Sequence, residues 1–332
     1  MNGILGFGPR LLRKLTPLCM TIAISAPALA QPTTIRVGYT ITTDITSAAL
    51  SSAQKKGLFK QAGLDVQPQP FVQSSQKYDA FKGKAIDVDI NAGAIEAGQL
   101  FAAGVPIVVL KAVQPADFWA VVVKSTSTAK TPTDFKGKPY GVVSLSGTNF
   151  GATYLAFKIE NVDLMRDVRV SVLPPAGIIA ALQNGTIEGA TLYEPYLSQA
   201  IRSGTVKEIF RPVELYKRHY GATLFALNVT ARQDFYSSNK DAVKKFLTIL
   251  DTEARSLPKN LPEASAALSA AVPALKESPE QVEALLKPYA GDYITDQNDP
   301  AFLRQVQAYY DRLYEIRQVP RPVKASDFWI MP

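Results

Sequence analysis

YDAFKGKAIDVDINAG (Tyr78–Gly93) has a counterpart about 100 residues further along the chain, IAALQNGTIEGATLYEP (Ile179–Pro195). In both stretches a helical pattern stops at a glycine, an isoleucine precedes an acidic residue, and an apolar strand leads into a polar loop. A period of this length is too long for a solenoid repeat. The two stretches therefore predict two lobes that are built on one plan and related by pseudo-symmetry.

The rest of the chain alternates between strand and helix patterns. In the first half we predict strands over 35–39, 64–70, 85–90, 107–113 and 119–124, and helices over 47–56, 75–81 and 92–103. In the second half we predict strands over 139–145, 168–174, 189–192, 208–210 and 222–230, and helices over 148–160, 176–183 and 196–203. The C-terminal part is predicted to be helical over 239–256, 262–272, 279–286 and 300–314. This alternation predicts an α/β fold with a mostly parallel sheet, flanked by helices, in each lobe. In such sheets a ligand binds beyond the carboxyl ends of the strands.

The N-terminus has the pattern of a secretory signal peptide. Three basic residues within 10–14 precede an apolar run over 15–26, which is too short to span a bilayer. Ala28-Leu29-Ala30 then matches a cleavage pattern, so we expect cleavage after Ala30 and removal of residues 1–30. Cys19, the only cysteine, would be removed with this segment. The sequence therefore predicts a periplasmic protein that needs no disulfide and has no Cys-based metal site.

The charged residues of the remaining chain argue against several classes of function. Cleavage removes three positive charges from a net charge of +7, and no block of Lys and Arg is interleaved with aromatic residues. We therefore expect no nucleic-acid partner. His219 is the only histidine, and this excludes a His-based zinc or iron site. A hydrolase pair of Ser144 or Ser146 with His219 is an alternative, but a surface or hinge position suits His219 better. We predict no catalytic residue, no cofactor and no metal.

SLSGTNFGATY (144–154) places small residues and hydroxyls between a predicted strand and a predicted helix. A phosphate-binding P-loop would end in Gly-Lys-Ser/Thr, and this stretch has no lysine. A nucleophile elbow would need Gly-x-Ser-x-Gly, and the glycines are wrongly spaced around Ser144. The free N–H groups of the helix start can instead hold an anion or another acceptor. The alternative is that Thr148 only caps its own helix.

Several segments carry a resemblance to a known family. They are FKGKAIDVDINAGAIEAGQLFAAGVPIVVLKA (81–112), TPTDFKGKPYGVVSLSGTNFGATYLAF (131–157) and PAGIIAALQNGTIEGATLYEPY (175–196). Together with the signal peptide, the chain resembles the periplasmic substrate-binding proteins of ABC importers, in the branch that binds aliphatic sulfonates, taurine and nitrate (NMT1/THI5-like). The resemblance implies a type II fold in which two lobes are joined by two crossing strands, near Val121–Lys124 and Tyr220–Leu224. The implied domains are residues 31–121 (first part of lobe 1), 122–221 (lobe 2) and 222–332 (second part of lobe 1, with a helical C-terminus).

The resemblance also implies a ligand cleft that is lined by loops of both lobes. From the first lobe it implies Tyr39, Thr40, Asp44, Gln73, Ser74, Ser75, Asn91, Ala92, Gln114, Asp117, Phe118 and Trp119. From the second lobe it implies Ser144, Ser146, Gly147, Thr148, Asn149, Pro175, Ala176, Tyr193 and Glu194. Most of these residues stand at strand ends or helix starts, which the patterns select independently. Each has an ordinary alternative: Asp44 and Asp117 as solvated turn residues, Tyr39 and Trp119 as core, and Glu194 as a brace for the helix that follows.

The charges of these loops suggest the kind of ligand. Asp44, Asp117 and Glu194 are their only acidic residues, and no Lys or Arg is present. An anionic group would have to be held by N–H groups and hydroxyls, while the carboxylates favour a ligand with N–H donors. An amino-sulfonate or an aminopyrimidine therefore fits better than nitrate.

The resemblance implies that the protein captures a small organic ligand and, after hinge closure, delivers it to an ABC permease. We expect a monomer that has no enzymatic activity. The first alternative is an enzyme of the same fold that resembles fungal pyrimidine synthases. Those proteins carry a histidine in the first lobe, where this sequence has none. The second alternative is a periplasmic partner that presents a ligand to a sensor.

Overall fold

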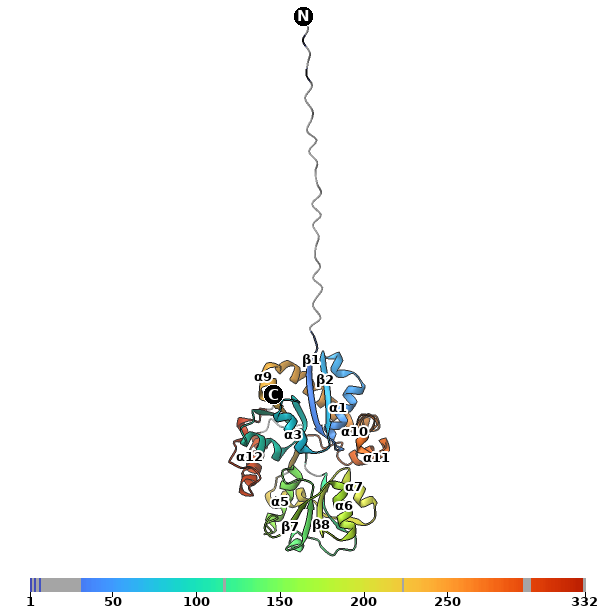
Figure 1. Ribbon diagram of the computed structural model, residues 1–332, viewed down its shortest axis with the longest axis vertical. Coiled ribbons are helices and arrows are strands. Elements are labelled where there is room, and N and C mark those ends of the chain that lie inside the picture. The colour runs from blue at the N-terminus through green and yellow to red at the C-terminus, as the bar shows by residue number, and fades with distance from the viewer. Residues whose placement is uncertain are drawn as a thin grey trace. The chain divides into compact units, whose positions relative to one another are not determined.

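The computed structural model describes residues 31–115, 118–222, 224–294 and 300–330, together with Met1, Gly3 and Gly6. The chain divides into two units, Met1–Gln31 and Pro32–Pro332. All helices and strands of the described residues lie in the second unit (Figure 1). The predicted signal peptide lies almost entirely outside the described residues. Within the described part of the chain, no helix has the length and apolar character needed to cross a membrane.

The first sheet contains five strands in the order β2-β1-β3-β10-β4. Their bounds are Thr33–Thr40 (β1), Leu64–Phe71 (β2), Val88–Gly93 (β3), Ile107–Pro115 (β4) and Phe225–Arg232 (β10). Strand β1 pairs in parallel with β2 and β3, whereas β10 is antiparallel to both β3 and β4. Only β10 therefore runs against the other strands, and the prediction of a mostly parallel sheet is confirmed.

The second sheet repeats this topology in the order β7-β6-β8-β5-β9. Its strands are Trp119–Lys124 (β5), Pro139–Val142 (β6), Arg169–Val172 (β7), Gly189–Tyr193 (β8) and Val206–Phe210 (β9). Strand β5 is antiparallel to β8 and β9, as β10 is to its neighbours in the first sheet. The predicted pseudo-symmetry is thus present in the strand order. We use the terms first lobe and second lobe for these two sheets with the helices that cover them.

The chain passes between the sheets twice. Strand β4 ends at Pro115 in the first sheet, and Trp119 already pairs with Tyr193 in the second. The predicted crossing near Val121–Lys124 is therefore wrong, because these residues are already paired within the second sheet, Val121 and Val122 with both β8 and β9 and the other two with β9. An apolar, β-branched run indicates a strand but does not indicate which sheet the strand joins. We propose a lobe boundary just before Trp119, in place of the one at 121–122. The second passage lies between the end of a helix at Tyr220 and the start of β10, within the predicted Tyr220–Leu224.

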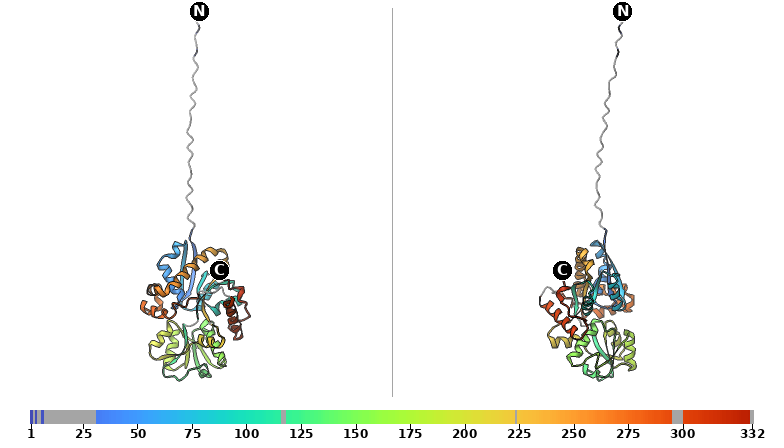
Figure 2. Two further views of the ribbon diagram at one scale, coloured as in Figure 1. Left: turned by 180° about the vertical axis from the view of Figure 1, so that it is seen from behind. Right: turned by 60° about the vertical axis from the view of Figure 1, so that its left-hand side comes forward.

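Helices cover both sheets (Figure 2). Those that begin between strands are α1 (Ile45–Lys55), α2 (Leu58–Gln61), α3 (Ser74–Lys82), α4 (Ala94–Ala102), α5 (Thr148–Ile159), α6 (Pro175–Asn184), α7 (Tyr196–Arg202) and α8 (Pro212–Tyr220). The C-terminal ones are α9 (Gln233–Ser238), α10 (Lys240–Ala271), α11 (Pro279–Leu286) and α12 (Pro300–Glu315). The two helices predicted over 239–256 and 262–272 form α10, which has a non-helical residue, Asn260, between two prolines. The prediction missed the short helices α2 and α9, and it missed α8 although Pro212 marks its first turn.

The central strands are buried on both faces, which explains why their sequences are apolar throughout rather than alternating. In β5, for example, every residue from Trp119 to Val123 is buried. In both sheets several strands end in loops that lead directly into helices, such as β1 into α1 and β8 into α7, and polar residues lie in these loops. The fold therefore brings the helix starts of both lobes toward one region.

Candidate ligand-binding site

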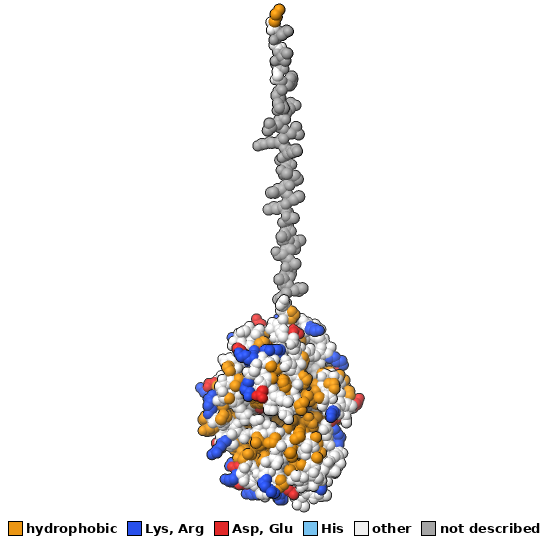
Figure 3. Space-filling model, viewed as in Figure 1, with side chains coloured by type: hydrophobic (Ala, Val, Ile, Leu, Met, Phe, Trp, Pro, Cys, Tyr) orange, Lys and Arg blue, Asp and Glu red, His pale blue; other side chains and the backbone are white. Residues whose placement is uncertain are grey.

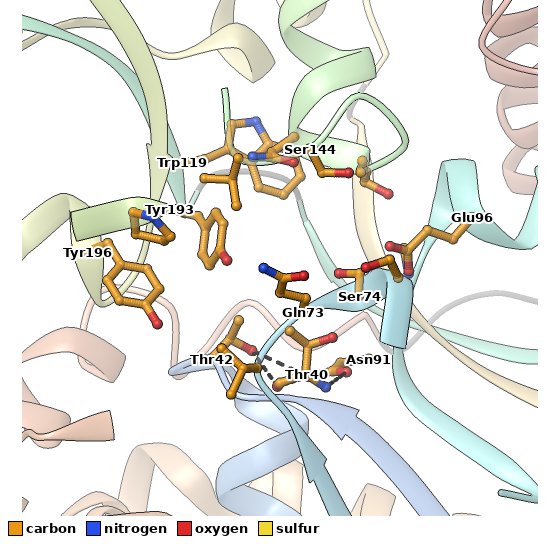
Figure 4. Close-up of a pocket in the computed structure, with 18 of the residues that line it drawn as sticks. Thr40, Thr42, Gln73, Ser74, Asn91, Glu96, Trp119, Ser144, Tyr193 and Tyr196 are labelled. Atoms are coloured by element: carbon orange, nitrogen blue, oxygen red, sulfur yellow. Dashed lines mark hydrogen bonds between the residues drawn. The ribbon is translucent and has the colours of Figure 1, made fainter. Parts of the chain in front are cut away.

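A cavity of about 450 Å³ lies where the carboxyl ends of strands from both sheets meet (Figure 4). The first lobe contributes Thr40, Thr42, Val72, Gln73, Ser74, Ser75, Asn91, Gly93, Glu96 and Leu227. Phe118 lines the cavity just before β5, and the second lobe contributes Trp119, Val143, Ser144, Leu145, Gly147, Thr148, Asn149, Val172, Pro174, Pro175, Tyr193 and Tyr196. This is the position in which open α/β sheets bind ligands.

The mouth of the cavity is apolar. Val72 from the first lobe and Leu145 and Val172 from the second line the cavity and are nevertheless exposed. Hydrophobic side chains also gather in the middle of the face seen in Figure 3. The rim therefore offers apolar contacts to a bound molecule from both lobes.

Two helices direct their first turns into the cavity. Ser74 and Ser75 begin α3, and Thr148 and Asn149 begin α5, so all four line the cavity. Neither N-cap residue accepts a hydrogen bond from its helix through a side chain. First-turn N–H groups have no partner within their own helix and carry partial positive charge. The two helix starts can therefore hold an acceptor-rich group of a ligand, as SLSGTN suggested.

The hydroxyl of Thr148 has a partner that the sequence did not reveal. Gly147, and not Thr148, is the N-cap of α5. The Thr148 Oγ1 atom instead accepts a hydrogen bond of 3.3 Å from the Ile95 N–H group, in the first turn of α4. The N-cap of α4 is Gly93, whose position has no room for a side chain because a Cβ atom there would be 2.2 Å from Thr148 Oγ1. Thr148 therefore caps a helix of the opposite lobe, which corrects the expectation that it caps its own.

The floor of the cavity is a buried polar network. The Asn91 side chain accepts from the Thr40 N–H group and donates to the Thr40 carbonyl oxygen, both at 2.9 Å. Its amide also donates to Asp44, which caps α1 and accepts from the backbone and hydroxyl of Ser47 and from Thr46. Asn91 thus joins strands β1 and β3. The sequence had suggested that it caps α4, and this prediction is wrong. Asp44 is fully buried and does not line the cavity.

A buried lysine beneath this floor was not predicted. Lys77 is 1% exposed, and its Nζ atom lies 2.9 Å from Asp89 and 3.0 Å from the carbonyl and side-chain oxygens of Asn91. Lysine is seldom buried, so nothing in the sequence marked it. Because Asp89 neutralises its charge, Lys77 fixes α3 to β3 and does not present a cation to the cavity.

One wall of the cavity is aromatic. Phe118 and Trp119 are in edge contact with ring centroids 4.9 Å apart, and Tyr193 and Tyr196 form a second edge contact at 5.6 Å. Burial raises the pKa of Tyr193, and the nearby Tyr196 and Glu96 raise it further. Tyr196 was missed by the sequence analysis, although it follows the selected Tyr193 and Glu194 after a single proline. These rings offer flat apolar surfaces and neutral hydroxyls.

Other residues named from the sequence lie outside the cavity lining. They are Tyr39, Asp44, Ala92, Gln114, Ser146, Ala176 and Glu194, while Asp117 lies outside the described residues. Tyr39 is core, and burial together with nearby Asp44 raises its pKa to about 12. Gln114 accepts from the Ile45 N–H group at 3.1 Å and supports the start of α1. Ser146 lines a smaller neighbouring cavity beside Ser75.

Glu194 supports its own helix rather than the cavity. Its carboxylate accepts from the backbone N–H group and the hydroxyl of Ser198, at 3.1 and 2.9 Å. Burial raises the pKa of Glu194. The contacts therefore show that Glu194 braces the helix that follows it, α7, which was the alternative role.

The acidic residue that does line the cavity is Glu96, which the sequence analysis did not select. It is 4% exposed, and its Oε2 atom accepts from the N–H group of the N-cap residue Gly93 at 2.8 Å. The signal was present, because an acidic residue three positions after an N-cap is typical of a helix start. The predicted cap at Asn91 lies two residues too early, and this hides the signal. Among the described residues, no group of three or more His, Cys, Asp or Glu side chains is placed to hold a metal.

The fold has clear relatives among solved structures. The periplasmic aliphatic sulphonate-binding protein SsuA of Escherichia coli is 18% identical, with 90% of this chain and 97% of that chain covered and a TM-score of 0.75. The alkanesulfonate-binding protein SsuA of Xanthomonas axonopodis pv. citri, bound to MOPS, is 19% identical, with coverage of 91% and 99% and a TM-score of 0.75. The periplasmic nitrate-binding protein NrtA of Synechocystis PCC 6803 is 17% identical, with coverage of 89% and 84% and a TM-score of 0.69.

These similarities show that the chain has the two-lobed fold of periplasmic binding proteins. A comparison with curated proteins finds no match. The model of the NMT1-like family matches residues 28–272, which is most of the chain. The resemblance inferred from the sequence motifs is thereby confirmed, and the chain belongs to the NMT1-like family.

Proposed function

We propose that this protein is an extracytoplasmic solute-binding protein that captures a small organic solute between its lobes and delivers it to an ABC permease. The observation that carries the proposal is the cavity itself, which lies at strand ends and is lined by residues of both sheets. Relatives of the same fold are named for the binding of sulfonates and nitrate. Export to the periplasm, cleavage after Ala30 and a monomeric state are parts of this proposal.

Closure of the lobes is the step that would couple binding to delivery. A solute that touches both lobes binds the closed arrangement better and shifts the balance toward it. Direct contacts between the lobes support a defined closed arrangement. Thr148 bonds to Ile95 on one side, and Arg202 and Gln199 of α7 donate to Glu277 at 2.9 and 2.8 Å on another.

The lining supports a solute that is sulfonate-like, taurine-like or pyrimidine-like. No Lys, Arg or His occurs among the described residues that line the cavity. An acidic group of a solute would thus be held by the first turns of α3 and α5 and by hydroxyls such as Ser144. The aromatic wall would cover an apolar or flat part of the same molecule.

The site supports binding rather than catalysis. Ser144 and Ser146, the candidate nucleophiles, would need a general base within hydrogen-bond reach. His219 is exposed on α8, in edge contact with Tyr220, and does not line the cavity. The hydroxyls of Ser144 and Ser146 lie 3.1 Å apart and contact each other.

Native mass spectrometry of the protein purified from the periplasm would test the proposal. We expect a co-purified small molecule that is lost from a variant in which the cavity is filled, such as Ser144→Trp. A pull-down with solubilised membranes would then separate import from sensing, since a permease supports delivery and a receptor kinase supports sensing. Turnover of the bound molecule, or retention of it by the filled variant, would contradict the proposed function.

A further inference from the structure

We propose that Glu96 recognises a cationic nitrogen of the solute, so that the ligand is a compact organic ammonium compound with an apolar or aromatic body. The inference rests on the proposed function, because it concerns the same cavity. It differs from the charge argument made from the sequence, which relied on Asp44, Asp117 and Glu194. Asp44 and Glu194 are engaged elsewhere, whereas Glu96 lines the cavity.

One oxygen of Glu96 is left over by the helix that it caps. The Oε2 atom accepts from the Gly93 N–H group. The Ile95 N–H group, also in the first turn of α4, donates to Thr148 and not to Glu96. Oε1 has no hydrogen-bond partner among the described residues, and Figure 4 shows the carboxylate at the edge of the cavity near Ser74. The capping role therefore explains one oxygen, and the other is free for a ligand donor.

The charge of Glu96 is not compensated by any described side chain that lines the cavity, since none of these is Lys, Arg or His. Lys77 is the buried cation of the floor, and it is bound to Asp89 and Asn91. The Glu96 carboxylate is 4% exposed and accepts one backbone hydrogen bond, so a donor that enters the cavity would meet a carboxylate without an ion-pair partner. A protonated amine would supply the missing charge and donate to Oε1.

The aromatic wall suits the remainder of such a molecule. Tyr193 is close enough to Glu96 for the carboxylate to contribute to the raised pKa of its hydroxyl. Trp119, Tyr193 and Tyr196 present aromatic rings to the same cavity. Ring faces stabilise an ammonium ion and also cover an apolar group attached to it. The volume of about 450 Å³ limits the solute to a compact one.

The test uses two probes that share one body and differ in charge, 2-phenylethylamine and 2-phenylethanesulfonate, in calorimetric titrations of the mature protein. We expect the amine to bind at least tenfold more tightly than the sulfonate. Glu96→Gln keeps an acceptor for the Gly93 N–H group, removes the charge, and should weaken amine binding at least tenfold without weakening sulfonate binding. Glu188→Gln, at an exposed acid outside the cavity lining, is the matched control and should leave both unchanged.

Urea denaturation of Glu96→Gln shows whether this variant is folded. A second variant, Glu96→Asp, keeps the negative charge and should retain the preference for the amine. The inference is overturned if the wild-type protein prefers the sulfonate, shows no preference, or binds neither probe. It is also overturned if folded Glu96→Gln keeps the preference. These outcomes leave the proposed function standing as long as native mass spectrometry finds a captured solute, so the two failures are distinguishable.

Discussion

The bond between Thr148 and Ile95 gives the sharpest test of how the lobes hold together. Thr148→Val removes the hydroxyl but keeps the shape of the side chain, so little packing is lost. The Ile95 N–H group belongs to a residue that is 0% exposed, and it would lose its acceptor. An unsatisfied buried donor costs about 1–3 kcal/mol, and the length of 3.3 Å places this bond in the lower part, at about 1–2 kcal/mol.

Because the bond joins the two lobes, its loss should affect both folding and closure. We expect the free energy of unfolding of Thr148→Val in urea to fall by about 1–2 kcal/mol. The affinity for the co-purified solute should fall by about 5- to 30-fold, which is the same free energy. Thr148→Ser keeps the oxygen and should recover most of both, while Thr248→Val, at an exposed threonine of α10, should change neither. If stability and affinity both stay within about 0.5 kcal/mol of wild type, the assignment of Thr148 as an interlobe cap is refuted.

Three further predictions concern buried charges. Asp44→Asn places amide donors against hydroxyl and N–H donors and should lower the free energy of unfolding by at least about 2 kcal/mol in urea denaturation; an unchanged midpoint would contradict the network. Arg202→Ala leaves Glu277 with one hydrogen-bond donor, Gln199, and should weaken solute binding by about 1 kcal/mol at low salt. The loss should be smaller at high salt, because Arg202 is half exposed and its charge is screened. A loss of affinity that does not depend on salt would argue against an ionic contact. Burial opposes the charge of Asp251, but hydrogen bonds from Lys111 and two other donors outweigh the effect of burial and lower the pKa of Asp251. The stability that Asp251 contributes is therefore complete above about pH 4 and is lost as the pH falls through the lowered pKa. Thermal unfolding should be measured between about pH 6 and about pH 2, which spans the reference pKa of about 4. The unfolding temperature of Asp251→Asn should change less with pH than that of the wild type, and equal slopes of unfolding temperature against pH would exclude this role.

The charged residues at the site show why a ligand argument from sequence needed correction. Asp44 and Glu194 stand beside predicted strand ends, so their carboxylates were expected to be available to a ligand. In the structure each is consumed by hydrogen bonds to the helix that it starts. Glu96 was passed over because the start of α4 was placed at Asn91, and a shift of two residues moved this acid from the helix start into the second turn. An error of two residues at an element boundary was enough to change which acid was chosen.

The sequence by itself determined the α/β class, the duplicated plan and the places where helices begin. Hydrophobic periodicity, glycine stops and capping residues act over a few positions, so they can be read along the chain. Most strands and helices were accordingly predicted to within a few residues, and SLSGTN was predicted to open a helix, whose first turn lines the cavity. The helices α2, α8 and α9 were not predicted, and in α8 polar and charged residues hid the buried face of Val213 and Tyr216.

Only the tertiary structure decided which partners these groups find. The crossing before Trp119, the burial of Lys77 against Asp89, and the bond from Ile95 to Thr148 all join residues that local patterns treat separately. A polar side chain is free for a ligand only if no distant residue satisfies it first. That depends on how the two sheets are placed, and periodicity along the chain carries no information about it.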